Sequence, residues 1–443
     1  MLLTLSGMSA GYGYGQGKVL DDYIQRAFSQ NQGLKQQSFQ LDKSLYALQE
    51  AKSLFYPQVG LTGNYTKAGG GRTIDIPIGD MLNPVYSTLN QLTNSQKFPQ
   101  LENQSVLLNP DNFYDVHVRT SLPLINTEIW YAQKIRKENI TLQQASVNVY
   151  KRKLVKDIKT AYYQYYQAGK AVAIYNAALL QVQENIRVNT SFLNNGVTNS
   201  TALTRAKAEQ QKIAASITEA ENKQRNAAAY FNFLLNRDLD ATIAIDSSIF
   251  IPEEILPPPA TTGNTRDELL QISQQQKIAS LFYRQSKSYL VPKLSTFLDL
   301  GSQGFNWNVD SKSRYYMWGV NLQWDLFAGG QRKYKAQQAA IDVSNLQAAY
   351  NEASNSFQLE QQVAENNYRT AVANFGSARE QLVLSEKYYN DQSKVYKAGQ
   401  LLYIELLDAQ TQLTNAKLQL SVAFAAVQTA IADIERTQAS YKL

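Results

Sequence analysis

The sequence lacks cysteine entirely and contains a single histidine, His117. The absence of cysteine excludes disulfide bonds, thiolate metal sites, a cysteine nucleophile and a lipid anchor attached through sulfur. One histidine argues against histidine catalysis and against a multi-histidine metal site. The sequence also lacks a nucleotide-binding loop and a recognisable nucleophile–base pair. We therefore expect no enzyme, no cofactor and no bound metal.

Long apolar runs are missing as well. No stretch reaches the roughly 18 consecutive apolar residues that a membrane-spanning helix requires. If the chain crosses a bilayer, it must therefore do so with strands that close into a barrel. The net charge of +6 over 443 residues is mild and dispersed, so we expect no nucleic-acid partner.

Proline is confined to a few places. The eleven prolines are Pro57, those within 77–123, those within 252–259, and Pro292. The remaining long segments, 124–251 and 293–443, contain almost no helix breaker and therefore predict very long helices.

Apolar residues from Leu402 to Ile434 alternate spacings of four and three, a heptad pattern that predicts a left-handed coiled coil. The segment 343–382 shows the same stripe with one stutter near Glu360. The stripe recurs 203 positions earlier, where Gln143 is its one break, and Gly399 corresponds in the same way to Gly196. This repetition predicts an internal duplication, in which each half has a long helix, a glycine turn and a return helix.

Four other segments alternate apolar or aromatic residues with polar ones, at about 57–66, 114–124, 292–301 and 314–326. This period of two is typical of barrel strands with one lipid-facing side. A half-buried sheet in a soluble protein would show the same alternation, but no helix would then be left to cover the aromatic residues. Trp130, Trp318 and Trp324 suit an interfacial aromatic girdle. Four strands cannot close a barrel, so we expect three chains to contribute twelve.

The predicted organisation starts with a signal-peptide remnant or a disordered N-terminus over 1–17. The first repeat, 18–235, has helices over 18–56, 125–194 and 198–235. An equatorial linker over 236–263 follows, and residues 438–443 form a C-terminal tail. The second repeat, 264–437, has helices over 264–290, 331–398 and 402–437. The glycine- and proline-containing segment 67–112 is expected to be a mobile surface loop.

Several motifs together carry a resemblance. Residues 324–330 read WDLFAGG at the entry to a helix, residues 396–399 read YKAG, and residues 404–409 read IELLDA. The expected helix–strand junctions are Pro57, Pro123, Pro292, Gly329 and Gly330. With these features the sequence resembles the TolC-like outer membrane efflux proteins over about 18–437.

The resemblance implies a mainly α fold with a β-barrel: a long coiled-coil α-helical barrel and a trimeric 12-stranded outer-membrane barrel. It also implies a homotrimer in the outer membrane of a Gram-negative bacterium, surrounded by outer-membrane lipid and extending into the periplasm. A periplasmic adaptor (membrane fusion) protein and an inner-membrane pump of the RND or ABC type would be its partners.

Glu405 and Asp408 lie three residues apart and therefore share a helix face. In a trimer they would form two rings of carboxylates, and by resemblance they match the acidic rings at the family's periplasmic entrance. An ordinary solvated acidic face is the alternative. Tyr396 stands where the family has a tyrosine that helps to lock the tip. Ala202 and Leu401 replace the aspartate and the arginine of that lock, so we expect the lock to be absent in that form.

Gly196 and Gly399 permit the positive φ that a tight helix–helix turn needs. They are the expected adaptor-docking turns, with Val197, Leu401 and Leu402 as apolar neighbours, although they could equally be simple C-caps. The sequence thus predicts a passive exit duct of a tripartite efflux or type I secretion system. Drug efflux, metal efflux and protein secretion remain open alternatives. A soluble or periplasmic coiled-coil scaffold or adaptor is the alternative class.

Overall fold

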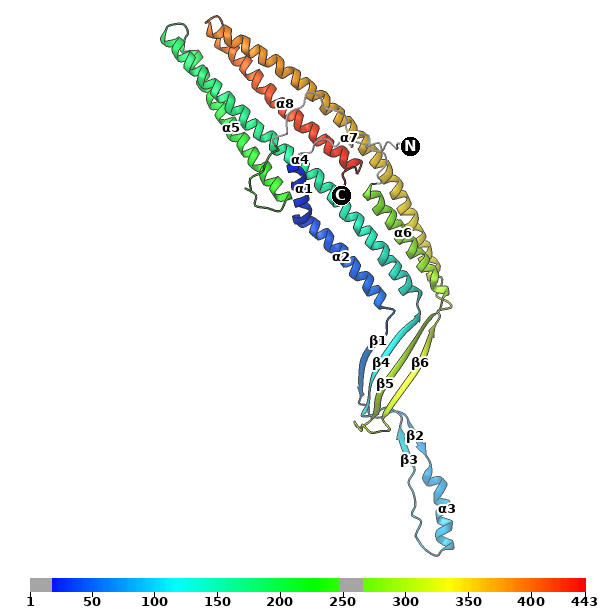
Figure 1. The fold of residues 1–443 in the computed structure, drawn as a ribbon. Helices are drawn as coiled ribbons and strands as arrows, with labels where there is room; N and C mark the ends of the chain where they lie inside the picture. Colours follow the sequence, from blue (N-terminus) through cyan, green and yellow to red (C-terminus); the bar gives the residue numbers. More distant parts are fainter. Residues whose placement is uncertain (1–17, 247–265) are drawn as a thin grey trace, which may run out of the picture. The chain divides into compact units, whose positions relative to one another are not determined.

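In the computed structural model, residues 18–246 and 266–443 are described, and they form two compact units (Figure 1). The helical unit comprises 18–46, 137–279 and 341–443 within those limits, and the sheet unit comprises 47–136 and 280–340. The expected signal-peptide remnant over 1–17 and the proline-rich part of the expected linker lie outside the described residues.

The helices reproduce the duplication. Both α5 (Ser200–Leu234) and α8 (Tyr403–Thr437) contain 35 residues, and their first and last residues are each 203 positions apart. The helices that precede them, α4 (Thr127–Asn194) and α7 (Gln331–Lys397), contain 68 and 67 residues and also end 203 positions apart. The other described α-helices of the two repeats are α1 (Lys18–Gln30), α2 (Gln32–Ser53) and α6 (Asp267–Lys287).

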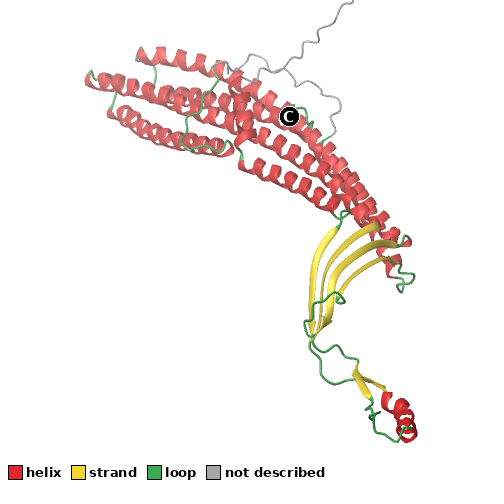
Figure 2. Ribbon diagram, turned by 60° about the horizontal axis from the view of Figure 1, so that its bottom comes forward, coloured by secondary structure: helices red, strands yellow, loops and turns green. Residues whose placement is uncertain are grey.

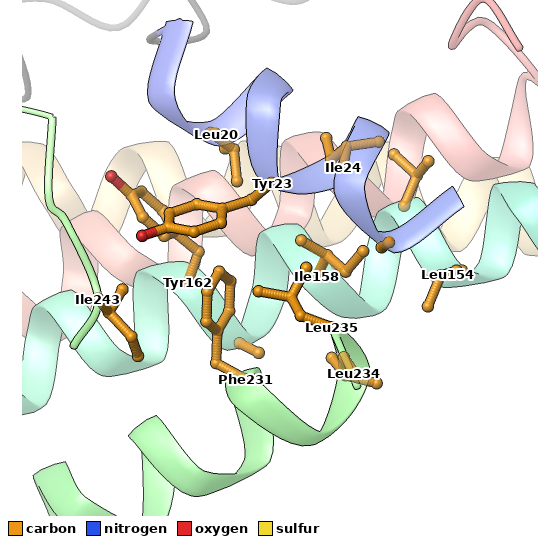
Figure 3. Packing of buried hydrophobic residues seen from close by; sticks show 13 residues of the cluster. Leu20, Tyr23, Ile24, Leu154, Ile158, Tyr162, Phe231, Leu234, Leu235 and Ile243 are labelled. Carbon is orange, nitrogen blue, oxygen red and sulfur yellow. The ribbon is translucent and has the colours of Figure 1, made fainter. Parts of the chain in front are cut away.

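A buried cluster joins α1, α4 and the end of α5 (Figure 3). The ring of Tyr23 meets that of Phe231 edge-on at 5.1 Å and lies 6.4 Å from that of Tyr162. Phe231 and Tyr162 are fully buried, and each buried side chain of this size contributes about 1.5–3 kcal/mol. A second cluster packs the α7 and α8 stripes together, with Phe375 and Phe424 among its members and Tyr166 of α4 beside them.

Four charged side chains meet where the α7 heptad stripe stutters. Arg266 donates to Glu360 at 2.6 Å and to Glu268 at 3.0 Å. Arg436 of α8 donates to the same two carboxylates, at 2.9 and 3.4 Å. At Glu360, where the apolar stripe is interrupted, an ion-pair network therefore links α6, α7 and α8.

The sheet unit holds a four-stranded antiparallel sheet in the order β1-β4-β5-β6, whose strands are labelled in Figure 1 and drawn in yellow in Figure 2. Its strands are β1 (Gln58–Thr66), β4 (Phe113–Ile125), β5 (Lys293–Phe305) and β6 (Arg314–Gln323). Neither β1 nor β6 has a strand partner on its outer edge among the described residues. The predicted fold class, long paired helices with four strands per chain, is confirmed.

The register separates the two faces of this sheet. Leu61, Val118, Leu300 and Tyr316 lie side by side across the four strands and form one apolar row. On the opposite face Arg119 binds Asp299 through two hydrogen bonds of 2.7 Å. Period-two alternation in the sequence has therefore become an apolar face and a polar face.

The long segment between β1 and β4 is folded rather than irregular. It contains β2 (Thr73–Ile76), α3 (Ile78–Leu92) and β3 (Gln104–Leu107), with β2 paired to β3. Two asparagines on α3 fasten the returning chain: Asn83 exchanges hydrogen bonds with the backbone of Leu101, and Asn90 does the same with Phe98.

None of the described helices has both the length and the apolar character needed to cross a membrane.

Candidate functional site

The two helical turns of the helical unit have the same backbone geometry. Gly196 has φ +73° and Gly399 has φ +75°. At the first turn the Val197 amide donates to the Phe192 carbonyl and the Gly196 amide to the Leu193 carbonyl, at 2.8 and 3.1 Å. The second turn repeats this double bond with Gln400 to Val395 and Gly399 to Tyr396. Both are Schellman caps, for which a left-handed glycine is the favoured residue.

Apolar side chains are exposed at these turns. Val197 is 58 % exposed and Leu402, which precedes α8, is 68 % exposed. Leu401 is half-buried, and Ala202 packs at the margin of a small core formed by Tyr396, Tyr403 and Leu406. The predicted docking residues thus lie at or beside the turns, where the single chain leaves part of their apolar surface uncovered.

The two predicted gate carboxylates lie on one exposed stripe of α8. Glu405 is in the first helical turn, where a negative charge interacts favourably with the helix dipole. Asp408 accepts a hydrogen bond of 2.7 Å from Gln412, one turn further along the same stripe. Neither carboxylate forms an ion pair with another side chain in the described part of the protein.

A chain of buried hydrogen bonds lies beneath the turns. The Tyr396 hydroxyl of α7 donates to Asn189 Oδ1 of α4 at 2.6 Å. Asn185 Nδ2 of α4 donates to Gln410 Oε1 of α8 at 2.8 Å, and Gln410 Nε2 donates to the Ala178 carbonyl at 3.3 Å. Because these bonds run between α4 and the α7–α8 pair, they hold the two helical hairpins together near their turns. We call the four side chains Tyr396, Asn189, Asn185 and Gln410 the tip network.

The tip network carries no formal charge. Burial raises the pKa of Tyr396, and burial likewise raises the pKa of neighbouring Tyr403, so both phenols stay protonated at neutral pH. Asn189 is fully buried, so an unmatched amide oxygen there would be costly. The Tyr396 hydroxyl therefore binds Asn189. The resemblance places the partners of this tyrosine at positions 202 and 401 instead.

Sequence reasoning missed the three amides of this network. One signal was present: Asn189 continues the heptad stripe of Val182 and Ile186 at the expected spacing. An asparagine at a heptad core position typically fixes the register of neighbouring helices.

In the sheet unit the predicted girdle tryptophans are all exposed: Trp130 is 44 %, Trp318 67 % and Trp324 53 % exposed. Trp318 belongs to the apolar face of β6, and Trp130 lies in the first turn of α4.

The predicted junction residues stand near the ends of strands and helices. Pro57 and Pro292 directly precede β1 and β5, and Pro123 lies within β4 beside a bulge. Gly329 and Gly330 precede α7 with φ values of +57° and +80°.

Comparison with known proteins agrees with this fold. Residues 263–438 match the outer membrane efflux protein family. The outer membrane protein TolC of Escherichia coli K12 is 20 % identical over 436 residues, which cover 95 % of this chain and 81 % of that protein. Among solved structures, the CmeC outer membrane channel of Campylobacter jejuni has a TM-score of 0.77 at 13 % identity, covering 95 % of this chain and 85 % of CmeC. The outer-membrane channel OprN has a TM-score of 0.76 at 16 % identity, covering 95 % and 90 %.

The duplicated helical hairpins and the two-faced sheet therefore define a channel protein of the outer membrane. More specifically, residues 263–438 match the outer membrane efflux protein family, and the chain is similar to TolC over 95 % of its length. Its location is the outer membrane of a Gram-negative bacterium. Its family is one of efflux ducts and not of enzymes.

Proposed function

We propose that three copies of this chain form a passive exit duct, which an adaptor protein opens at its periplasmic tip and an inner-membrane pump of the RND or ABC type powers. One observation carries the proposal: the sheet has an apolar face, and its edge strands β1 and β6 lack an outer partner within 18–246 and 266–443. In hydrocarbon each unpaired backbone group costs several kcal/mol. Pairing β6 of one copy with β1 of the next removes both edges and gives twelve strands, an even number as such barrels require.

Two adjacent residues of edge strand β1 test this assembly. Leu61 lies on the apolar face and is 75 % exposed, whereas Thr62 lies on the polar face. Leu61→Asp should prevent formation of a heat-modifiable, membrane-extracted trimer, because a charge would face lipid. Thr62→Asp, with its charge on the polar side, should still assemble. A water-soluble coiled-coil scaffold would tolerate both variants equally, and that result would refute the channel.

Glu405 and Asp408 would form the cation-selective rings of the tip. Crowded carboxylates in a constriction attract cations, and both side chains are exposed on one stripe without an ion-pair partner in the described chain. We expect Glu405→Gln with Asp408→Asn to lower cation selectivity in single-channel recordings. The matched control changes Asp342 and Glu352, two exposed acids of α7, to their amides. Equal selectivity in both double variants would show that the stripe is only a solvated face.

The turns would receive the adaptor, because Val197 and Leu402 present apolar surface there. The chain has no native cysteine, so a single cysteine can report on contacts. Leu402→Cys, carrying a short thiol-reactive photocrosslinker, should capture the adaptor in assembled complexes. Ala214→Cys, exposed in the middle of α5, should not. An adduct at both positions or at neither would contradict docking at the turns.

The tip network gives this opening a physical basis. Opening that moves one helical hairpin away from the other must break the Tyr396–Asn189 and Asn185–Gln410 hydrogen bonds. An adaptor that binds the turns more tightly in the separated arrangement would supply the free energy for this change.

A further inference from the structure

Positive charge is concentrated where helices and strands meet in the sheet unit. The segments 126–136, 280–293 and 324–340 contain eight lysines and arginines but only two carboxylates. This surplus equals the net charge of the whole chain, +6. The cations are Lys134, Arg136, Arg284, Lys287, Lys293, Arg332, Lys333 and Lys335.

The two carboxylates are already engaged. Glu128 binds Lys293 at 2.8 Å, and Asp325 binds Arg332 at 2.6 Å. Across residues 18–246 and 266–443, no ion pair joins a carboxylate to Arg284, Lys287 or Lys333, and all three residues are exposed. These cations are therefore available to an anion from outside the chain.

Two pockets lie at these junctions between helices and strands, and Lys287 lines both. The first, of about 530 Å³, lies between the start of α4 and the end of α6, with Trp130, Tyr131 and Arg284 in its wall. The second, of about 370 Å³, lies between the end of α6 and the start of α7, with Arg332 and Lys333 in its wall. One cation is thus shared between adjoining cavities, which places at least two cationic side chains around each of them.

Aromatic rings flank the same cations. Lys287 Nζ lies 4.3 Å from the centroid of Tyr283, and the Arg332 guanidinium lies 5.0 Å from that of Tyr289. Lys134 Nζ lies 3.4 Å from the ring of Trp130. Aromatic side chains beside lysine and arginine are typical of the boundary between hydrocarbon and water.

Exposed apolar side chains adjoin the basic groups. Leu290, in the wall of the second pocket, is 66 % exposed, and Val291, in the wall of the first, is 43 % exposed. A free inorganic anion would make no apolar contact with these side chains. An amphiphile would place its charged headgroup against the cations and its acyl chains against the apolar residues.

We infer that this pair of pockets binds the headgroup of a phospholipid with net negative charge, such as phosphatidylglycerol, from the membrane leaflet on the helical side. The inference rests on the proposed barrel, which would place the strands in hydrocarbon and these pockets at headgroup depth. The binding free energy from one lysine or arginine near an anionic membrane surface changes the affinity about fivefold. The removal of two cations should therefore weaken binding by roughly thirtyfold.

Native mass spectrometry of the detergent-extracted trimer tests the site, with phosphatidylglycerol and phosphatidylethanolamine as the added lipids. Wild type should retain phosphatidylglycerol preferentially, and Arg284→Gln with Lys287→Gln should reduce that retention about thirtyfold. The control, Arg205→Gln with Lys207→Gln, removes one arginine and one lysine that are exposed on α5, and it should retain the lipid as wild type does.

Equal retention by wild type and the Arg284/Lys287 variant, or equal binding of both lipids, would overturn the inference. Displacement of phosphatidylglycerol by millimolar inorganic phosphate would also overturn it, since the site would then recognise a free anion. These failures would occur in an intact trimer, whereas failure of the channel proposal would appear earlier, as a chain that never becomes a heat-modifiable membrane trimer.

Discussion

The hydrogen bond from Tyr396 to Asn189 offers the sharpest test of how the tip is held shut. Tyr396→Phe removes one hydroxyl and leaves Asn189 Oδ1 buried without that donor. A buried acceptor left unsatisfied costs about 1–3 kcal/mol. When the hairpins have separated, water can bind the same oxygen, so the substitution changes the free energy of the open state little. The substitution should therefore favour opening by about 2 kcal/mol per subunit, or roughly thirtyfold in the equilibrium.

Single-channel recording in planar bilayers measures this shift directly. Tyr396→Phe should raise the conductance or the open probability of the channel without an adaptor present. Tyr230→Phe removes a hydroxyl from a tyrosine of α5 that is 48 % exposed, and it should leave the recordings unchanged. If Tyr396→Phe lowers the midpoint of thermal unfolding but the channel stays closed, the tip network stabilises the fold without controlling the gate, and the reasoning fails.

Three further outcomes follow from individual contacts. Gly399→Ala should lower stability by about 1 kcal/mol because φ is positive at that position, although a Cβ there would meet open space. Gly376 has equal space but lies in a helix interior, so Gly376→Ala should stabilise the protein slightly, and thermal unfolding compares the two variants. Burial opposes ionisation of Glu268, yet hydrogen bonds from its arginine partners hold its pKa below the ordinary 4.5. The contribution of the Glu268 carboxylate to folding stability is therefore present above pH 4.5 and is lost as the pH falls through the lowered pKa. Glu268→Gln should therefore weaken the acid sensitivity of the unfolding midpoint. Asn90→Ala removes both hydrogen bonds to Phe98 and should expose 93–103 to limited proteolysis, whereas Gln91→Ala should not.

Much of the fold could be predicted because two periodicities are strongly expressed. The heptad stripe recurs at a fixed offset, and that offset reappears in the ends of α5 and α8. The strands were visible because residues such as Leu61 and Val118, which pair across β1 and β4, alternate with polar neighbours. Both patterns are local, so neither required knowledge of which elements meet.

The tip network and the β2–α3–β3 segment depend on contacts between distant residues. Asn189 falls on the heptad stripe, but the stripe does not show which residue it binds, and its partner Tyr396 is 207 positions away. Likewise Asn90 fastens the chain at Phe98 through side-chain bonds to the backbone, which leave no periodic signal. The pockets were also missed, since Lys287 and Lys333 come from helices far apart in the sequence.

Equal hairpin length constrains how such a chain can change. Each residue deleted from a helix moves everything beyond it by 1.5 Å and turns it by about 100°. A deletion in α4 and α5 alone would draw Gly196 back from the level of Gly399 and rotate Val197 away from the direction Leu402 faces. Only paired deletions, made in both repeats and in multiples of seven residues, would shorten the protein and preserve its two matching ends.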